Sequence, residues 1–380
     1  MTEKGDAPLA GYRILEVSHF LAGPYCGLLL GDLGAEVIKI EPEGGEVART
    51  VSPHSVGPHN LYFASLNRNK KGVTLNLASP EGQERLGRLA ASAHGLLTNL
   101  RPSAIKKLGL TYEALRKWND KLVCVSLTGY GLEGPHAEKP AFDYAIQAQG
   151  GAMALTGEPG SPPTRVGYSV VDNTTGMMAA LGLVAKILSG KGGQVDVAMH
   201  DVLLSQMNFM AAGWLNAGEE PRRLPMGAHP YFVPAQLFET REGHLVIFIT
   251  HDASWRQFAE AAGRPDWCAD PAFATMAARL ENRERVIAAV AALFREDSAV
   301  NWVRRLAPRG VVISDVRTLP EALDSEVTRD REMVASMETP GGTLRGVGNP
   351  IKVPGWKTAY HPPPLLGEHN EALLRPDKGK

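Results

Sequence analysis

The acidic residue best placed to carry out chemistry is Asp172, which follows a strand-like run and precedes an apolar helix predicted over residues 173–188. A carboxylate in apolar surroundings is costly to bury without a partner. Asp172 is either an N-cap of the helix, a role that Asn173 or Thr174 could also fill, or a reactive group. Gly176 costs about 1 kcal/mol relative to alanine in a helix, so it indicates close approach of backbone or ligand.

Two basic segments lie beside predicted strands. The first contains Arg68, Lys70 and Lys71, and the second contains Arg101 and Lys107 around a helix that opens with proline. A helix N-terminus and a nearby cluster of cations both attract anions. The alternative interpretation is a pair of solvated basic turns. Because the formal net charge is −1, any anion site on this chain must be local.

Other catalytic or binding motifs are missing from the sequence. The first predicted strand–helix turn has single glycines in place of G-x-G-x-x-G, so a dinucleotide site is not expected. There is no G-x-x-x-x-G-K-[ST] loop, no G-x-S-x-G elbow, no H-E-x-x-H and no cysteine pair. This pattern argues against P-loop, serine-hydrolase and metal chemistry. We expect no metal and no tightly bound cofactor.

Composition limits the partners and the compartment. The near-zero net charge of the 380-residue chain provides no overall attraction to nucleic acid or membrane. Cys26, Cys124 and Cys268 are far apart in apolar surroundings, which predicts buried thiols in a reducing compartment. The polar N-terminal segment lacks a signal core, and no apolar run approaches the roughly 20 residues of a membrane span. We expect a cytoplasmic protein that binds neither nucleic acid nor membrane.

The pattern of elements predicts an α/β fold. Residues 12–18 and 35–41 read as strands joined by a short helix, and this alternation continues to about residue 200. We therefore expect a large Rossmann-like domain with a mostly parallel sheet over residues 1–220. A segment rich in proline and glycine then introduces a smaller α+β domain with its linkers, residues 221–329. The proline-rich remainder, 330–380, is expected to return and complete the large domain.

Seven segments of the chain resemble, in order and spacing, those of the family III CoA-transferases. This is the CaiB/BaiF superfamily, which includes the crotonobetainyl-CoA and formyl-CoA transferases. The resemblance runs from about residue 9 to the end of the chain and rests on the whole series of segments. They are LEVSHFLAGPYCGLLLGDLGAEVIKIE, NRNKKGVTLNL, GYGLEGPHAEKPAFDYAIQAQGGAMALTG, RVGYSVVDNTTG, GKGGQVDVAMHDVLL, PYFVPAQLFETREGHL and PPLLGEHNEALL.

The resemblance implies roles for particular residues. The nucleophile of the family is an aspartate in a D-x-x-x-G segment, here Asp172 with Gly176. Contacts with CoA are implied for His19, Phe20, Leu21, Ala22, Arg68, Lys70, Lys71, Asn99, Leu100, Arg101, Lys107, Gly131 and Asp143. Contacts with the acyl substrate, or a place in a lid, are implied for Phe142, Gly176, Met226 and Gly227. The chain departs from some relatives at Leu21, where they have glutamine, and at Pro42, where they have arginine.

The implied reaction moves CoA from an acyl-CoA donor to a small carboxylic acid. Asp172 would form a mixed anhydride and then an aspartyl-CoA thioester, a form of covalent catalysis with a carboxylate nucleophile. At its reference pKa the carboxylate is ionised at pH 7, so no general base is expected. Backbone N–H groups of the glycine-rich segments 129–134 or 226–229 are candidate oxyanion donors. The resemblance also implies an interlocked homodimer.

Two other functions compete with CoA transfer. An α-methylacyl-CoA racemase of the same superfamily needs a histidine in a G-H-D triplet, whose counterparts here are Ala141, Phe142 and Asp143. Phe142 cannot exchange a proton, which favours transfer. The other alternative is a CoA-binding protein without catalytic activity. Asp143 is expected either to hold the Asp172 segment by hydrogen bonding or to be a surface acid.

Overall fold

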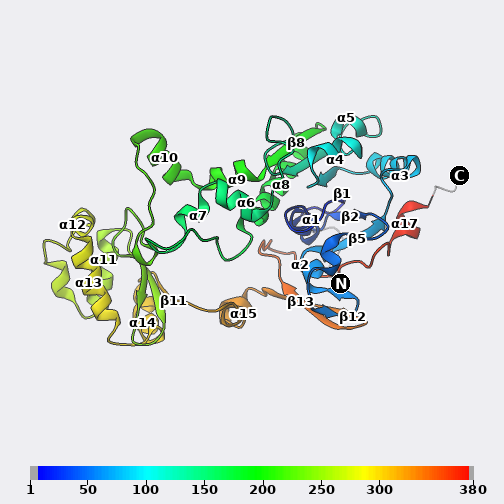
Figure 1. Ribbon diagram of the computed structural model, residues 1–380. Helices are drawn as coiled ribbons and strands as arrows, with labels where there is room; N and C mark the ends of the chain where they lie inside the picture. Colours follow the sequence, from blue (N-terminus) through cyan, green and yellow to red (C-terminus); the bar gives the residue numbers. More distant parts are fainter. Residues whose placement is uncertain (1–6, 376–380) are drawn as a thin grey trace. The chain divides into compact units, whose positions relative to one another are not determined.

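The computed structural model describes residues 7–375 (Figure 1). The described chain forms two compact units. One comprises residues up to 152 together with 165–212 and everything from 326 onward, and the other comprises 153–164 and 213–325. The division falls after residue 212, whereas the predicted boundary is residue 220. The outermost residues of the predicted large domain, before 7 and after 375, lie outside the described range.

A six-stranded parallel sheet forms the centre of the first unit. Its strands are β1 (Arg13–Val17), β2 (Glu36–Glu41), β5 (Lys70–Thr74), β6 (Gly95–Thr98), β7 (Val123–Thr128) and β8 (Gly193–Ala198). Their order is β5-β2-β1-β6-β7-β8, the order of a doubly wound Rossmann-like sheet, and this confirms the predicted α/β class. Ligands of such sheets bind at the carboxyl ends of the strands where the order reverses, here beside β1 and β6.

Helices bury both faces of this sheet, which explains why its strands are almost continuously apolar. Side chains alternate between the faces along each strand. Leu15 belongs to a core cluster with α3 (Pro80–Ala91), whereas its neighbour Ile14 belongs to a cluster with α1 (Ala22–Asp32) and α8 (Val170–Leu188). None of the helices within the described range is both long and apolar enough to cross a membrane.

The remaining helices up to residue 217 connect the strands or follow the sheet. They are η1 (Val47–Thr50), α2 (Leu61–Asn67), α4 (Pro102–Lys107), α5 (Tyr112–Leu115), α6 (Asp143–Gln149), α7 (Ala152–Leu155), α9 (Met199–Gln206) and α10 (Asn208–Ala217). Ser79 caps α3, as its place before Pro80 predicts, by accepting the Gly82 N–H at 3.0 Å.

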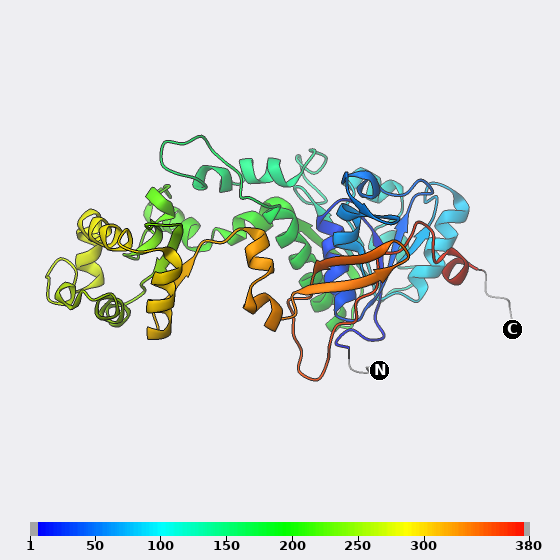
Figure 2. The ribbon, with the colours of Figure 1, turned by 90° about the horizontal axis from the view of Figure 1, so that it is seen from below.

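The C-terminal part of the described chain packs on the edge of the sheet beside β5. Asn370, the first residue of α17 (Asn370–Leu374), accepts the Thr74 N–H through its Oδ1 at 2.8 Å. The hairpin of β12 (Val334–Thr339) and β13 (Gly342–Val347), orange in Figure 2, lies against the N-terminal part of the chain. It contacts the small hairpin of β3 (Ser55–Val56) and β4 (His59–Asn60), where Gly57 and Gly341 meet without room for a Cβ atom. The bond from Asn370 covers part of the edge of β5, which would otherwise be open.

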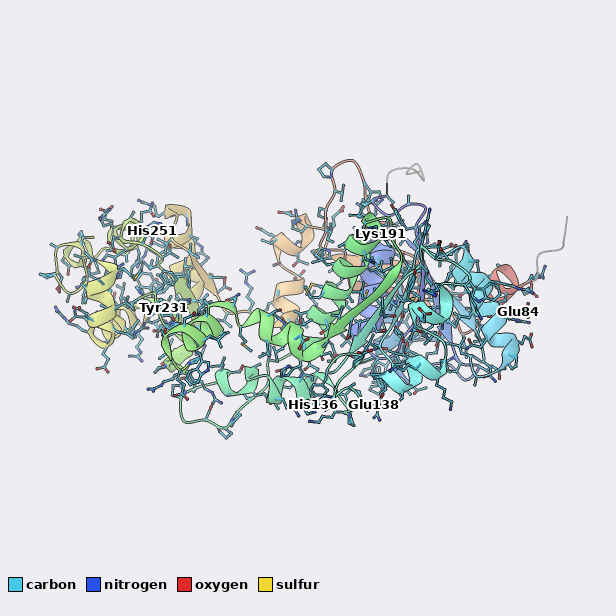
Figure 3. The ribbon with its side chains drawn as sticks, turned by 90° about the horizontal axis from the view of Figure 1, so that it is seen from above. Glu84, His136, Glu138, Lys191, Tyr231 and His251 are labelled. Carbon is cyan, nitrogen blue, oxygen red and sulfur yellow. The ribbon has the colours of Figure 1, made fainter. Side chains whose placement is uncertain are left out.

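The second unit is a small α+β domain with an antiparallel sheet in the order β11-β10-β9. The hairpin predicted around Gly243 joins β9 (Ala235–Glu239) to β10 (His244–Phe248). The other elements of this unit are η2 (Pro225–Gly227), α11 (Asp252–Ala261), η3 (Pro265–Cys268), α12 (Met276–Glu281), α13 (Arg283–Phe294), α14 (Ala299–Leu306), η4 (Ala307–Arg309), β11 (Ile313–Asp315) and α15 (Leu319–Leu323). The next helix, α16 (Glu326–Asp330), already belongs to the first unit. His251, labelled in Figure 3, caps α11 by accepting the Ser254 N–H on Nδ1.

Candidate active site

Asp172 lies in the first turn of α8 and does not cap it. The N-cap residue is Ser169, whose side chain makes no capping hydrogen bond. Thr174 donates its hydroxyl to the carbonyl oxygen of Val170 at 2.7 Å, within the helix itself. The capping interpretation of Asp172, Asn173 and Thr174 is therefore wrong. The Asp172 carboxylate is left for another role.

Asp143 supplies the cap from a different helix, α6. Its side chain is buried, with 3% of the residue exposed. Oδ1 accepts the backbone N–H groups of Val171 at 2.8 Å and Asp172 at 3.3 Å, and Oδ2 accepts the Gln147 side-chain amide at 2.6 Å. These bonds satisfy N–H groups at the start of α8 that lack partners inside the helix. The hydrogen-bonding interpretation of Asp143 is confirmed, and the surface-acid alternative is wrong.

The surroundings of Asp172 raise its pKa from 3.8 to about 7. Burial is the larger cause, because desolvation disfavours the charged form, and the negative charge of Asp143 adds to it. The expectation of an ionised carboxylate at pH 7 assumed the reference pKa, and the raised pKa departs from that value. Perturbed carboxyl groups that face a cavity are frequent in active sites.

Gly176 lets α8 lie directly against the start of α1. A Cβ atom at this position would be 2.7 Å from the Ala22 carbonyl oxygen and 3.1 Å from Cδ1 of Tyr25. The predicted close backbone approach is confirmed. Because Asp172 precedes Gly176 by about one helical turn, this packing holds the carboxylate beside the loop that leads into α1.

A cavity of about 350 Å³ opens at Asp172, and we call it the Asp172 cavity. Its lining consists of residues 19–22, 99–104, 127–129, Ala137, 139–142, Asp172 and Met199. Two cations, Arg101 and Lys139, share this lining with the Asp172 carboxyl group. The cavity therefore combines a candidate nucleophile with positive charge that attracts carboxylates or phosphates.

A second cavity, of about 720 Å³, lies at the carboxyl ends of the strands, and we call it the strand-end cavity. Its lining consists of residues 17–20, 40–47, 75–78, Leu100 and Leu108. His19, Phe20 and Leu100 line both cavities, so the two adjoin at these residues. This is the position beside β1 and β6 where doubly wound sheets bind ligands.

The loop between the two cavities is held in an unusual conformation. The Asn99 side chain accepts the His19 N–H at 2.9 Å and donates to the His19 carbonyl oxygen at 2.8 Å. Phe20 has a φ of +59°, which is uncommon for a bulky side chain. Its ring makes edge contacts with those of His19 and Phe142. Burial lowers the pKa of His19, the charge of Glu46 opposes that shift, and Lys39 adds to it.

Eight of the predicted site residues line one or both cavities together with Asp172. They are His19, Phe20, Leu21, Ala22, Asn99, Leu100, Arg101 and Phe142. Asp143 is outside both linings and acts on Asp172 through α8. Pro42, where some relatives have arginine, lines the strand-end cavity.

The cations of the first basic segment do not reach either cavity. Arg68 is buried in an ion pair with Asp32, and Lys70 is buried against Glu16 at 2.8 Å, where burial lowers its pKa to about 8. Lys71 pairs with a carboxylate at the amino end of β2, whereas the cavities lie at the carboxyl ends of the strands. The expected phosphate contacts of Arg68, Lys70 and Lys71 are therefore corrected: all three charges are already paired within the protein.

The second basic segment is brought to the site only in part. Arg101 lines the Asp172 cavity, but Lys107 is exposed at the end of α4, just before Leu108 of the strand-end cavity. Glu138, labelled in Figure 3, accepts the Ser103 N–H at 2.7 Å and the Ser103 hydroxyl at 2.8 Å. The N-terminus of α4 thus holds an anion that belongs to the protein itself, not a ligand.

The remaining predicted positions lie outside both linings. Gly131 has a φ of +94° and donates its N–H to the Thr128 hydroxyl at 2.8 Å. Met226 and Gly227 belong to the second unit, in η2, where both have positive φ values. The Met226 N–H donates to the Glu158 carboxylate at 3.0 Å. The lid role of Met226 and Gly227 stays a prediction.

Sequence reasoning missed three parts of the site. Residues 43–47 and 75–78 line the strand-end cavity and follow the ends of β2 and β5, so the strand order identifies them once it is known. Lys139 stands three residues before Phe142 on the same cavity wall. Tyr62 on α2 is within electrostatic reach of Asp172, since burial, the charge of Asp172 and the charge of Glu46 raise its pKa. Nothing in the local sequence pattern distinguishes Tyr62.

Comparison with known proteins identifies the family. The sequence model described as CoA-transferase family III matches residues 9–370. The acetyl-CoA:oxalate CoA-transferase of Acetobacter aceti is 32% identical over 380 residues, which cover 98% of this chain and 96% of that protein. The succinate–glutarate CoA-transferase of Agrobacterium fabrum is 31% identical, with coverage of 97% and 95%. The crystal structure of a CaiB/BaiF family protein from Brucella suis matches 96% of this chain and 98% of that one, with a TM-score of 0.83 and 31% identity. The protein described here belongs to CoA-transferase family III.

Proposed function

We propose that this CoA-transferase moves CoA from an acyl-CoA to a small carboxylic acid with Asp172 as its nucleophile. The observation that carries the proposal is the position of Asp172, whose carboxyl group has a pKa of about 7 and lines a cavity that adjoins the strand-end cavity. An acyl-CoA bound across both cavities would place its thioester at Asp172 and its nucleotide at the carboxyl ends of β1, β2 and β5.

The proposed reaction proceeds by four exchanges at carbonyl carbons. The Asp172 carboxylate attacks the donor thioester, the C–S bond breaks, and CoA leaves as a thiolate while a mixed anhydride forms. The thiolate attacks the aspartyl carbonyl and expels the donor acid, which leaves an aspartyl-CoA thioester. The acceptor carboxylate then attacks this thioester, which releases CoA thiolate and forms a second mixed anhydride. Attack of the thiolate on the acceptor carbonyl forms the new acyl-CoA and restores Asp172.

The charge around Asp172 supports carboxylic acids as substrates. Arg101 and Lys139 line the same cavity and offer cationic partners to an acid. A dicarboxylic acid would place one carboxylate at the aspartyl-CoA carbonyl and the other near a cation. The relatives named for oxalate and for succinate and glutarate are consistent with this class. We therefore propose small dicarboxylic acids as acceptors, with acetyl-, formyl- or succinyl-CoA as donors.

Chemical trapping tests the role of Asp172. The enzyme is mixed with succinyl-CoA and treated with hydroxylamine or borohydride, and its peptides are analysed by mass spectrometry. A hydroxamate, or reduction of the carboxyl group to an alcohol, should map to Asp172. The Asp172→Ala variant should lose both the label and transfer activity, whereas Asp201→Asn on α9, with 81% of its side chain exposed, is a control that should keep both. Undiminished transfer by Asp172→Ala would disprove the proposal.

The substrate class is tested with a panel of acids. Oxalate, succinate, glutarate and their monocarboxylic counterparts are assayed against acetyl-, formyl- and succinyl-CoA. The proposal expects dicarboxylates to give the larger kcat/KM, and equal values for monocarboxylates of the same length would contradict it. A separate incubation of a 2-methylacyl-CoA in deuterated water, without an acceptor acid, tests for racemase chemistry. Deuterium entering the α-carbon of a 2-methylacyl-CoA without an acceptor acid would favour a racemase.

We also propose that the enzyme is a homodimer, because α8 and α9 expose apolar side chains. Met177, Met178 and Leu181 are 43%, 43% and 60% exposed, and Leu188 at the end of α8 is 76% exposed. Leu204 of α9 is 47% exposed. Surfaces of this kind are often covered by a partner. Sedimentation at micromolar concentration should give twice the chain mass of 40.9 kDa, and a monomer would contradict this proposal.

A further inference from the structure

A hydrogen bond joins the side chain of Glu46 to the loop that lies between the two cavities. Its Oε2 accepts the backbone N–H of Phe20 at 2.9 Å. Phe20 is the loop residue with a φ of +59°, a backbone conformation that residues other than glycine rarely adopt. A strained residue persists only where its surroundings hold it. The Glu46 carboxylate is the side-chain group that binds the strained N–H directly.

The other carboxylate oxygen of Glu46 is anchored in the protein interior. Oε1 lies 2.8 Å from the ammonium of Lys39 on β2, and both side chains are almost completely buried. Lys39 also contacts Oε1 of Glu16 at 3.1 Å and donates to the Ser18 carbonyl oxygen at 3.0 Å. Glu16 in turn pairs with Lys70. One buried network thus connects the strands β1, β2 and β5 to the loop that begins at Ser18.

The backbone of Glu46 is equally well fixed. Its N–H donates to Oε2 of Glu41 at 3.1 Å. The same carboxylate accepts two bonds from Arg49, at 2.7 and 2.6 Å, which fold residues 42–49 over the end of β2. Glu46 is therefore a short, rigid connection between the sheet and Phe20. Glutamine cannot replace it fully, because an amide offers one acceptor oxygen where both Phe20 and Lys39 require one.

We propose that Glu46 is a positioning residue that holds the loop from His19 to Leu21 in the conformation required for binding CoA. The loop lines both cavities, so its position decides whether a CoA thioester can span them. Because His19 and Phe20 line both cavities, a change of Phe20 to a negative φ would alter the walls of both. Glu46 itself lines the strand-end cavity, but it acts on the ligand through Phe20. The proposal rests on the proposed use of both cavities by CoA.

Binding of CoA to the free enzyme tests the proposal without requiring turnover. Glu46→Ala releases both Phe20 and Lys39, and Glu46→Gln satisfies only one of them. We expect the Kd for CoA, measured by calorimetry, to rise about tenfold in Glu46→Ala and by a smaller factor in Glu46→Gln. A tenfold change corresponds to about 1.4 kcal/mol, comparable to the cost of a left-handed backbone conformation for a side chain other than glycine.

A second pair of variants separates positioning from general stability. Glycine adopts a positive φ without strain, so in the Phe20→Gly background the hydrogen bond from residue 20 to Glu46 no longer has to hold a strained backbone. There we expect Glu46→Ala to change the Kd for CoA by about twofold or less. Asp32→Asn is the matched control, since it breaks the buried ion pair with Arg68 far from the loop. It should lower Tm but leave the Kd for CoA unchanged.

The outcomes are distinct. An unchanged Kd in Glu46→Ala, or an equal loss of affinity with and without Phe20→Gly, would overturn the proposal. An equal loss of affinity in Asp32→Asn would assign the effect to stability and also overturn it. If Glu46→Ala does not fold, Glu46→Gln is compared in the same two backgrounds. Failure of the proposed function would appear differently, as the absence of CoA binding and transfer in the unaltered enzyme.

Discussion

The raised pKa of Asp172 predicts a pH dependence that an ordinary aspartate would not show. The proposed nucleophile must be ionised to attack, and the pKa of Asp172 in the folded protein is about 7 instead of 3.8. The rate of attack on the thioester therefore rises with pH and levels off above neutrality. Part of the shift comes from the charge of Asp143 on α6, whose carboxylate accepts hydrogen bonds from the start of α8. Asp143→Asn should consequently move the rise to lower pH.

The magnitude follows from the ionised fraction. With a pKa of about 7, about one-tenth of the Asp172 groups are ionised at pH 6 and about nine-tenths at pH 8, an increase of about tenfold. With the ordinary value of 3.8, the ionised fraction would change by about 1% over the same range. The substitution Asp143→Asn removes the charge but keeps a side-chain oxygen that can accept the Val171 N–H, so α8 retains its cap.

The assay is kcat/KM for succinyl-CoA between pH 5.5 and 8.5, because this quantity reports the ionisation of the free enzyme. Any titration of the substrate itself contributes equally to both enzymes and cancels in their comparison. Asp201→Asn serves as the exposed-acid control and should reproduce the unaltered profile. A flat profile from pH 6 to 8, or a profile that Asp143→Asn leaves unmoved, would refute the electrostatic reasoning.

Three further predictions concern stability. Gly176→Ala places a methyl group 2.7 Å from the Ala22 carbonyl oxygen, so it should cost about 1–3 kcal/mol of unfolding free energy, seen as a lower Tm. Arg68→Met leaves Asp32 buried without its cation, so it should cost about 3–5 kcal/mol of unfolding free energy, measured with urea. The Kd for CoA should stay unchanged, and a higher Kd would indicate that Arg68 contacts a phosphate of CoA after all. Because the folded-state pKa of Asp172 lies above 3.8, its ionisation destabilises the fold increasingly between about pH 4 and pH 7. Asp172→Asn should therefore raise Tm at pH 8 and leave it unchanged at pH 4, with at most about 4 kcal/mol of stabilisation, and an equal effect at both pH values would contradict this.

The parts of the molecule that follow from local pattern could be predicted from the sequence. The alternation of apolar strands and amphipathic helices predicts the parallel sheet, since both faces of such a sheet must be buried. Gly176 was recognisable because glycine is costly inside an apolar helix, whereas the local pattern of Asp172 also suits a helix cap and its proposed role came from the family resemblance. The packing of Gly176 on Ala22 gives the physical reason for that glycine.

The parts that depend on pairing between distant residues could not be predicted. The sequence shows that Arg68 and Lys70 are cations but not that Asp32 and Glu16 neutralise them inside the fold. Lys139, which does line the Asp172 cavity, has no neighbouring basic residue to draw attention to it. A charge in a sequence carries no information about its partner, and the partner decides whether that charge is available to a ligand.

The environment of Asp172 suits its proposed role, in which the carboxylate must be both nucleophile and leaving group. A higher pKa makes the ionised carboxylate a stronger base and a better nucleophile toward a thioester, but it reduces the ionised fraction. The product of these two quantities is greatest when the pKa lies near the working pH. Burial provides most of the shift and Asp143 the rest, while the hydrogen bonds of Asp143 go to the backbone of α8. Asp143 thus fixes the position of the nucleophile without stabilising its charged form, which a direct hydrogen bond to the Asp172 carboxylate would do.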